Sequence, residues 1–384
     1  MRLFSPIRIG SLELKNRLAF APCGTNYASE EGFPTERLLS HYRRIARGGS
    51  GLVIVEATSV NHQRRRREKH CLGIYEDRFI PPLRTLVSQI HHEGGRAAIQ
   101  LVDSLLAVGK RPADLSLEEI DALIDDFVSS SLRAREAGFD AIEYHMAHLY
   151  TLADFLSRKG NKRQDAFGGN AEGRLRIAQE VLRRSRQALG SGIPFLCRIN
   201  GDEFTVGGNT LQDARQIARR LVEFGAEAIH VSAGGRIDDI LGSYREALLK
   251  EKEGSAPPGQ GAFELLSQCY SLSRTLPSAE MPDGVNVYLA EGIKKAVPVP
   301  VIAVGKINHP DLAEEIVREE RADLVALCRP LLADPAWPNK VREGRADQIV
   351  RCRCCNRCLA EVHFRGQPLL CSAWDGRETP IEIA

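Results

Sequence analysis

Residues 116–150 read SLEEIDALIDDFVSSSLRAREAGFDAIEYHMAHLY and contain one helix followed by one strand. Ser116 is followed three residues later by Glu119, the pattern of a capping box at the start of a helix. An amphipathic stretch continues as far as Gly138, which stands where a C-terminal glycine is expected to end a helix. The apolar run at 141–145 then predicts a buried strand. The stretch therefore predicts one helix-to-strand unit.

The same alternation continues through most of the chain. Strands are expected at residues 17–21, 51–57, 96–101, 141–145, 194–200, 226–232, 299–304 and 322–327. Helices are expected at residues 35–47, 80–93, 116–137, 170–189, 210–224, 310–319 and 335–344. Strands alternating with helices predict an α/β fold, a (βα)8 TIM barrel. A doubly wound open sheet produces the same alternation, but eight repeats in a chain of this length favour the barrel.

Composition narrows the class of protein. The 384 residues include 52 Lys and Arg against 50 Asp and Glu, so the formal net charge is +2, and 43% of the residues are hydrophobic. These values are typical of a globular protein and argue against disorder and against nucleic-acid binding by bulk charge. No apolar run is long enough for a membrane span, and the charged N-terminal stretch does not read as a signal peptide. We therefore expect a cytoplasmic protein.

Five of the ten cysteines lie between residues 352 and 371. Four of them have the spacing Cys352-x2-Cys355-x2-Cys358-x12-Cys371. Three crowded thiols and a fourth that returns after a loop favour a [4Fe-4S] cluster. A four-cysteine zinc site is the competing interpretation, although structural zinc usually takes two separated C-x-x-C pairs. Cys354 is a fifth thiol that could replace one of the four ligands.

The barrel assignment also predicts where function lies. Active sites of TIM barrels form at the C-terminal ends of the strands. That rule selects residues 22–25, Glu56, Gln100, 145–150, Arg198, 305–306 and 328–329.

One segment interrupts the regular alternation. Residues 235–283 are about twice as long as a usual connection and contain the Pro- and Gly-rich sequence GSAPPGQG at 254–261. We expect a lid or binding loop here, with a surface excursion of no particular role as the alternative.

Several longer stretches carry a family resemblance. They are LFSPIRIGSLELKNRLAFAP at 3–22, HMAHLYTLADFLSRKGNKRQDAFGG at 145–169, PVIAVGKI at 300–307 and ADLVALCRPLLADPAWPNK at 322–340. With these segments the chain resembles the Old Yellow Enzyme superfamily over nearly its whole length. It is similar in particular to the iron–sulfur flavoenzymes typified by 2,4-dienoyl-CoA reductase, 2-enoate reductase and trimethylamine dehydrogenase. Its cysteine spacing is similar to that of trimethylamine dehydrogenase.

The resemblance implies FMN at the top of the barrel and a [4Fe-4S] cluster beside it. The implied flavin contacts, with the phosphate group held by the last four, are Pro22, Cys23, Thr25, Ala57, Gln100, Arg198, Gly305, Lys306, Cys328 and Arg329. Among these, Arg198 is implied near N1 and the C2 carbonyl, where a fixed cation stabilises reduced flavin. Cys23 stands where the family commonly has Met, which implies different packing against the ring.

The resemblance also implies a catalytic group of His145, His148 and Tyr150. In the family, the two histidines receive the carbonyl oxygen of an unsaturated substrate, and the tyrosine supplies a proton. The leading prediction is reduction of an activated C=C bond in an α,β-unsaturated carbonyl compound or an acyl-CoA thioester. A C–N (amine) dehydrogenase resembling trimethylamine dehydrogenase is a second hypothesis. A non-catalytic electron-relay subunit is a third.

The sequence departs from the family pattern in two places, and a separate redox partner is expected. The segment at 100–104 reads QLVDS, without the His and Gly-Arg of the family pattern, which predicts a reshaped substrate pocket. No dinucleotide-binding G-x-G-x-x-G follows a strand. We therefore expect an FMN barrel at 1–345 and a cluster-binding extension at 346–384. Electrons are expected from a separate ferredoxin, electron-transfer flavoprotein or FAD/NAD(P)-binding subunit, in a homo- or hetero-oligomer.

Overall fold

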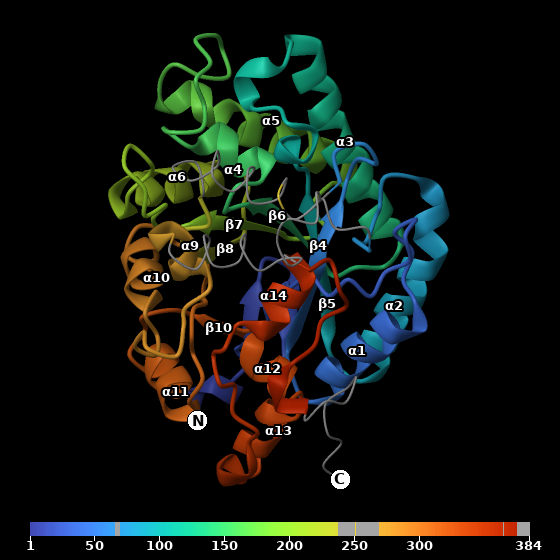
Figure 1. Ribbon diagram of the computed structural model, residues 1–384, viewed down its shortest axis with the longest axis vertical. Coiled ribbons are helices and arrows are strands. Elements are labelled where there is room, and N and C mark those ends of the chain that lie inside the picture. The colour runs from blue at the N-terminus through green and yellow to red at the C-terminus, as the bar shows by residue number, and fades with distance from the viewer. Residues whose placement is uncertain (66–69, 237–249, 251–268, 364, 375–384) are drawn as a thin grey trace.

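The computed structural model describes the whole chain except residues 66–69, 237–249, 251–268, 364 and 375–384. Its centre is a closed barrel in the order β10-β3-β4-β5-β6-β7-β8-β9 (Figure 1). The strands are β3 (Leu18–Phe20), β4 (Leu52–Ser59), β5 (Arg96–Val102), β6 (Ala141–Met146), β7 (Phe195–Asn200), β8 (Ala228–Ser232), β9 (Val301–Ala303) and β10 (Leu324–Leu327).

Closure of the sheet confirms the predicted TIM barrel. All neighbouring strands are parallel, and β10 pairs with β3 so that Leu327 lies opposite Phe20. An open doubly wound sheet would instead have two edge strands that each pair on one side only. Each predicted strand is present, with ends displaced by no more than a few residues.

The helices that surround the barrel follow the predicted pattern. The predicted ones include α1 (Glu36–Arg47), α2 (Ile80–His92), α3 (Leu117–Glu136), α5 (Ala171–Leu189), α6 (Leu211–Glu223) and α11 (Pro310–Arg318). A further helix, α10 (Val287–Lys294), was not predicted. The expected capping box between Ser116 and Glu119 begins α3, and Gly138, with φ +91°, follows its last turn. In the part of the chain that the structure describes, no helix combines the length and apolar character needed to cross a membrane.

A β-hairpin covers the N-terminal end of the barrel. It consists of β1 (Ile7–Ile9) and β2 (Leu12–Leu14), paired antiparallel. Ile9, Leu12 and Leu14 pack in one buried cluster with residues from the bottoms of the barrel strands. Apolar packing therefore closes this end of the barrel, and the candidate site lies at the other end.

Shorter elements lie mainly at the C-terminal end of the barrel. The helices are α4 (Thr151–Leu156), α9 (Tyr270–Thr275), α12 (Arg329–Ala333), α13 (Trp337–Arg342) and α14 (Arg357–His363). The 3-10 turns are η1 (Arg2–Phe4), η2 (Asp77–Phe79), η3 (Leu105–Val108), η4 (Pro112–Asp114), η6 (Ala346–Gln348) and η7 (Ser372–Trp374). Most of the predicted lid at 235–283 falls outside the described residues, so its role stays a prediction.

The cysteine-rich segment is attached to the top of the barrel by hydrogen bonds. The hydroxyl of Tyr27 donates to the carbonyl of Leu369 at 2.7 Å, and the backbone N–H of Leu369 donates to the carbonyl of Thr25 at 2.8 Å. The indole N–H of Trp374 donates to the carbonyl of Leu332 at 2.8 Å. These bonds bring the cysteine motif beside the loop that follows β3, as Figure 1 shows for the red C-terminal elements.

Candidate active site

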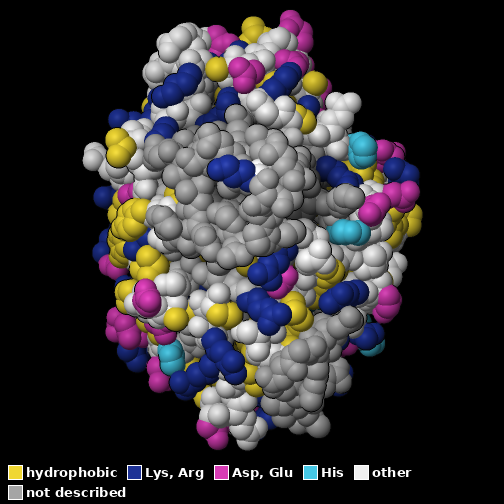
Figure 2. Space-filling model, viewed as in Figure 1, with side chains coloured by type: hydrophobic (Ala, Val, Ile, Leu, Met, Phe, Trp, Pro, Cys, Tyr) yellow, Lys and Arg dark blue, Asp and Glu magenta, His cyan; other side chains and the backbone are white. Residues whose placement is uncertain are grey.

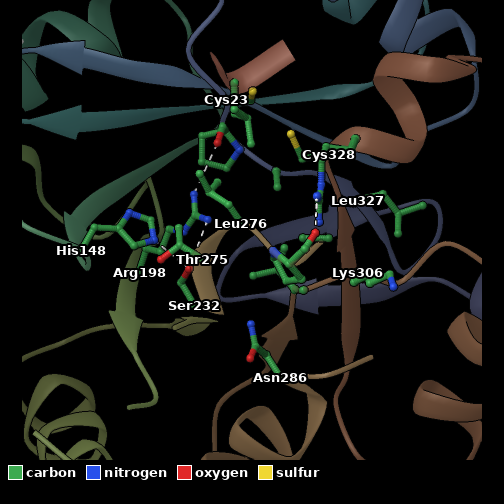
Figure 3. Close-up of a pocket in the computed structure, with 18 of the residues that line it drawn as sticks. Cys23, His148, Arg198, Ser232, Thr275, Leu276, Asn286, Lys306, Leu327 and Cys328 are labelled. Atoms are coloured by element: carbon green, nitrogen blue, oxygen red, sulfur yellow. Dashed lines mark hydrogen bonds between the residues drawn. The ribbon is translucent and has the colours of Figure 1, made fainter. Parts of the chain in front are cut away.

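A pocket opens at the C-terminal ends of the barrel strands (Figure 3). It is lined by nearly all of the residues that the sequence analysis assigned to flavin and substrate. These are Pro22, Cys23, Ala57, Gln100, His145, His148, Tyr150, Arg198, Gly305, Lys306, Cys328 and Arg329. Residues spread over most of the chain therefore meet in one cavity, because parallel strands present their ends on the same side.

Thr25 is the predicted contact that does not line the pocket. Its side chain is fully buried, and its hydroxyl donates to a carboxylate oxygen of Glu56 at 2.6 Å. The backbone N–H of Thr25 donates to the same oxygen at 3.1 Å. Glu56 thereby holds the loop that carries Pro22 and Cys23, so Thr25 shapes the pocket from behind.

Arg198 is a buried cation whose hydrogen-bonding capacity is only partly used. It lies on β7 with 8% of its surface exposed. Its Nη1 donates to the carbonyl of Pro22 at 3.4 Å and its Nη2 to the hydroxyl of Ser232 at 3.5 Å, both long for hydrogen bonds. Within the described part of the chain, Nε has no hydrogen-bond partner. A buried donor in this state suits an anionic or carbonyl group bound in the pocket, as FMN would supply.

Glu143 beneath the pocket determines how Gln100 is oriented. Its carboxylate accepts from Nε2 of Gln100 at 2.6 Å and lies 2.7 Å from Nδ1 of His230. A carboxylate only accepts, so the Gln100 amide must turn its NH2 toward Glu143, leaving its carbonyl oxygen available as an acceptor. Burial lowers the pKa of His230 despite the adjacent carboxylate.

Glu143 was not predicted, although the sequence held a signal for it. Glu143 and His145 are two residues apart on β6 and therefore point to the same face of that strand. An acidic residue on a buried barrel strand needs a buried partner. The need of a buried carboxylate for a partner was the signal in the sequence for a polar network below the site.

The opposite end of the pocket is built by Gly305, Lys306 and Arg329. Gly305 has φ +127°, and a Cβ there would lie 2.8 Å from Nδ2 of Asn286, so only glycine fits. The ammonium of Lys306 donates to the carbonyl of Ala279 at 2.8 Å and also to that of Met281, while Nη1 of Arg329 donates to the carbonyl of Pro277 at 2.7 Å. Both cations border the cavity while their polar ends hold the 277–281 segment.

His145, His148 and Tyr150 form a compact group at the end of β6. The ring centroids of His145 and His148 are 5.0 Å apart, and those of His145 and Tyr150 are 4.6 Å apart. Residue 148 turns the chain with φ +63°, and a Cβ at Gly235 would lie 2.8 Å from the Cβ of His148. The close approach of these two segments thus depends on glycine.

His148 is held as a neutral imidazole. Burial, with Arg198 and His230 as further causes, lowers its pKa well below the ordinary value. Its Nε2 lies 2.9 Å from the hydroxyl of Ser232 (Figure 3). A neutral imidazole has one N–H donor and one acceptor, and the Ser232 hydroxyl can pair with either of them.

The cysteine motif lies next to this pocket. Leu359 and His363 of α14 line the cavity together with Cys328. Cys358 is buried on the same helix, and burial raises the pKa of its thiol. The motif is therefore separated from the pocket by little more than one helix.

The four predicted cluster ligands provide the donor chemistry that iron–sulfur clusters use. Burial, with Cys355 as a smaller cause, raises the pKa of the Cys371 thiol. The thiol of Cys352 accepts from the backbone N–H of Cys354 at 3.3 Å. Among the described residues, no three His, Cys, Asp or Glu side chains are close enough to hold a single metal ion. The four thiols are the right donors for a cluster, and the cluster itself stays a prediction.

Comparison with known proteins gives one family and several relatives. The family described as NADH:flavin oxidoreductase / NADH oxidase matches residues 2–111, 104–248 and 277–348. The chain is 36% identical over 392 residues to the NADH oxidase of Thermoanaerobacter brockii, covering 96% of this chain and 55% of that protein. It is 30% identical over 366 residues to the NADPH dehydrogenase of Listeria monocytogenes serotype 4a (strain HCC23), covering 91% of this chain and 96% of the relative.

A solved structure extends the comparison. A 2-naphthoyl-CoA reductase in complex with 2-naphthoyl-CoA superposes with a TM-score of 0.82 at 25% identity, over 97% of this chain and 56% of that one. The chain therefore spans about half the length of this reductase and of the NADH oxidase, and nearly the whole length of the NADPH dehydrogenase.

Proposed function

Because the chain belongs to the NADH:flavin oxidoreductase / NADH oxidase family, we propose that it reduces an activated C=C bond with the help of FMN and a [4Fe-4S] cluster. Family membership confirms the resemblance predicted from the sequence and identifies the protein as an oxidoreductase of the flavin type. The substrate class is an α,β-unsaturated carbonyl compound or acyl-CoA thioester. The electrons come through a separate redox partner.

The observation that carries this proposal is the grouping of His145, His148 and Tyr150 in the pocket. Reduction of an enone or enoyl thioester builds negative charge on the carbonyl oxygen, and N–H donors from imidazoles stabilise that charge. A phenol beside them can deliver a proton to the α carbon of the double bond. The neutral imidazole of His148 keeps one N–H, which can donate a hydrogen bond to the carbonyl oxygen.

The residues around Arg198 fit the flavin. When bound, FMN would supply the redox chemistry that links the electron donor to the activated double bond. In our proposal Arg198 holds the electron-rich edge of the ring, and the carbonyl oxygen of Gln100, oriented by Glu143, accepts from the ring N–H. Pro22, Cys23 and Ala57 border the ring, and the backbone around Gly305 and Cys328 receives the phosphate group.

Cys352, Cys355, Cys358 and Cys371 would hold the cluster, which would supply one-electron transfer. We expect about four iron atoms per chain in anaerobically purified protein, the content of one cubane. Iron and sulfide analysis with the visible absorption spectrum measures this. Replacing Cys358 by Ser should lower the iron content while the flavin stays bound. Stoichiometric zinc without iron would show that the alternative interpretation of the cysteine spacing is the correct one.

The substrate class is supported by one relative. The 2-naphthoyl-CoA reductase, similar over 97% of this chain, binds an aromatic acyl-CoA thioester according to its structure. We expect crotonyl-CoA and a simple cyclic enone to shift the absorption spectrum of the oxidised flavin. We expect trimethylamine and histamine to leave it unchanged at matched concentrations. Spectral shifts and flavin reduction by the amines alone would identify an amine dehydrogenase, and no response to either class would favour an electron-relay subunit.

A further inference from the structure

Four arginines surround the cysteine motif on its solvent side. Arg351, Arg353 and Arg357 alternate with the cysteines, and Arg365 follows α14. All four are exposed. We call these four residues the arginine face. Figure 2 shows the corresponding gathering of Lys and Arg side chains over the region of α12 and α14.

The arginine face has little compensating negative charge. Between residues 349 and 374 the sequence contains one acidic residue, Glu361. Its side chain is 9% exposed and lies 3.5 Å from Arg357 and 2.9 Å from Arg365, whose side chains are each 52% exposed. Among the described residues, Arg351 and Arg353 have no ion-pair partner within 4.0 Å. Because the whole chain carries a formal charge of only +2, this excess is local.

The same short segment connects the arginine face to the pocket. Cys355 is exposed among the arginines, whereas Cys358 is buried on α14. Leu359 and His363 of α14 face the cavity. An electron that arrives at the arginine face therefore has only the cysteine motif to cross before it reaches the proposed flavin site.

We propose that the arginine face is the docking surface for an acidic electron-transfer protein. This inference rests on the proposed function, since it requires a cluster at the motif. Guanidinium groups pair with surface carboxylates, and a local positive field steers an acidic partner to the one place where electron transfer is short. An exposed cysteine at the centre of the positive charge favours a redox protein over a nucleic acid, which needs no such centre.

The test measures how fast an acidic redox protein reduces the holoenzyme. The probe is a photoreduced plant-type ferredoxin, mixed anaerobically with the enzyme in a stopped-flow instrument at salt concentrations from about 20 to about 300 mM. We expect the second-order rate constant to fall by about tenfold or more as salt is added. The variant Arg351→Glu/Arg353→Glu should be at least about tenfold slower than wild type at low salt and nearly independent of salt.

The matched control is Arg8→Glu/Lys295→Glu, which changes the net charge by the same amount. Arg8 is 71% and Lys295 68% exposed, and both lie at the closed, N-terminal end of the barrel. This variant should stay within about twofold of wild type, because steering depends on charge near the site of transfer.

Iron content and full reduction by dithionite are measured on every sample. If iron is present but the ferredoxin rate ignores salt, or if the control variant slows as much as the arginine-face variant, the docking proposal is overturned and the proposed function stands. If iron is absent, the cluster assignment and the docking proposal both fail. Tighter binding of single-stranded DNA than of ferredoxin, lost in Arg351→Glu/Arg353→Glu, would also overturn the docking proposal.

Discussion

Replacing Tyr150 by Phe is expected to slow the reoxidation of reduced flavin by an enoyl substrate by about 10²–10⁴-fold, the range for loss of a general acid. Tyr150 lines the pocket, and its ring lies 4.6 Å from that of His145. The substitution removes only the hydroxyl, so the packing of the ring is kept. Flavin content should be unchanged, because the proposed flavin contacts lie elsewhere in the pocket.

The measurement for Tyr150→Phe is anaerobic rapid mixing of the reduced enzyme with substrate. Tyr270→Phe is the matched control, because Tyr270 is 61% exposed on α9 and packs against Phe204 rather than in the pocket. The control should react at the rate of wild type. An unchanged rate for Tyr150→Phe would show that another group supplies the proton.

Replacing Arg198 by Met is expected to weaken FMN binding by about 10–100-fold, the effect of losing a hydrogen bond from a charged group worth about 1.5–3 kcal/mol. The turnover of enzyme saturated with FMN should fall as well, by about 10²-fold, because a fixed cation no longer stabilises the reduced ring. The physical basis is the buried guanidinium with two long hydrogen bonds and an Nε without a partner in the described residues. Arg198→Lys should recover only part of the loss, since an ammonium cannot reproduce the planar fork of donors.

Fluorescence quenching of FMN by the apoprotein measures the affinity of Arg198→Met. Arg183→Met is the matched control, because Arg183 lies on α5 with 47% of its side chain exposed and pairs with Glu180. Its FMN affinity should equal that of wild type. If Arg198→Met binds FMN as tightly as wild type, the flavin does not use this cation.

The regular elements followed from the sequence because their signals are local. The capping box at Ser116 and the glycine at 138 set the ends of α3, and apolar runs marked each barrel strand. The hairpin of β1 and β2 was not predicted. Its strands are three residues long, and they are stable because Ile9 and its neighbours pack against the bottom of the barrel. Such packing is formed only when distant strands meet.

The pocket was located from the sequence because the rule for parallel barrels is geometric. Any residue just past a strand reaches the same end of the barrel, so Gln100, Arg198 and Gly305 were expected together and do line one cavity. Their roles toward FMN and substrate stay predictions that the experiments above test. The family was predicted from contiguous stretches of sequence, and the match over most of the chain confirms it.

The sequence by itself determined the barrel, the family and the residues at the top of the strands, because each depends on periodicity or on a contiguous motif. Only the tertiary structure decided which partner each of these side chains contacts. Glu143 orients Gln100, Thr25 is turned toward Glu56, and the ammonium of Lys306 holds the carbonyls of the 277–281 segment. A buried carboxylate or ammonium takes the partner that folding brings within about 3 Å. That partner comes from another strand or loop, and neither the periodicity nor the spacing of residues encodes its direction.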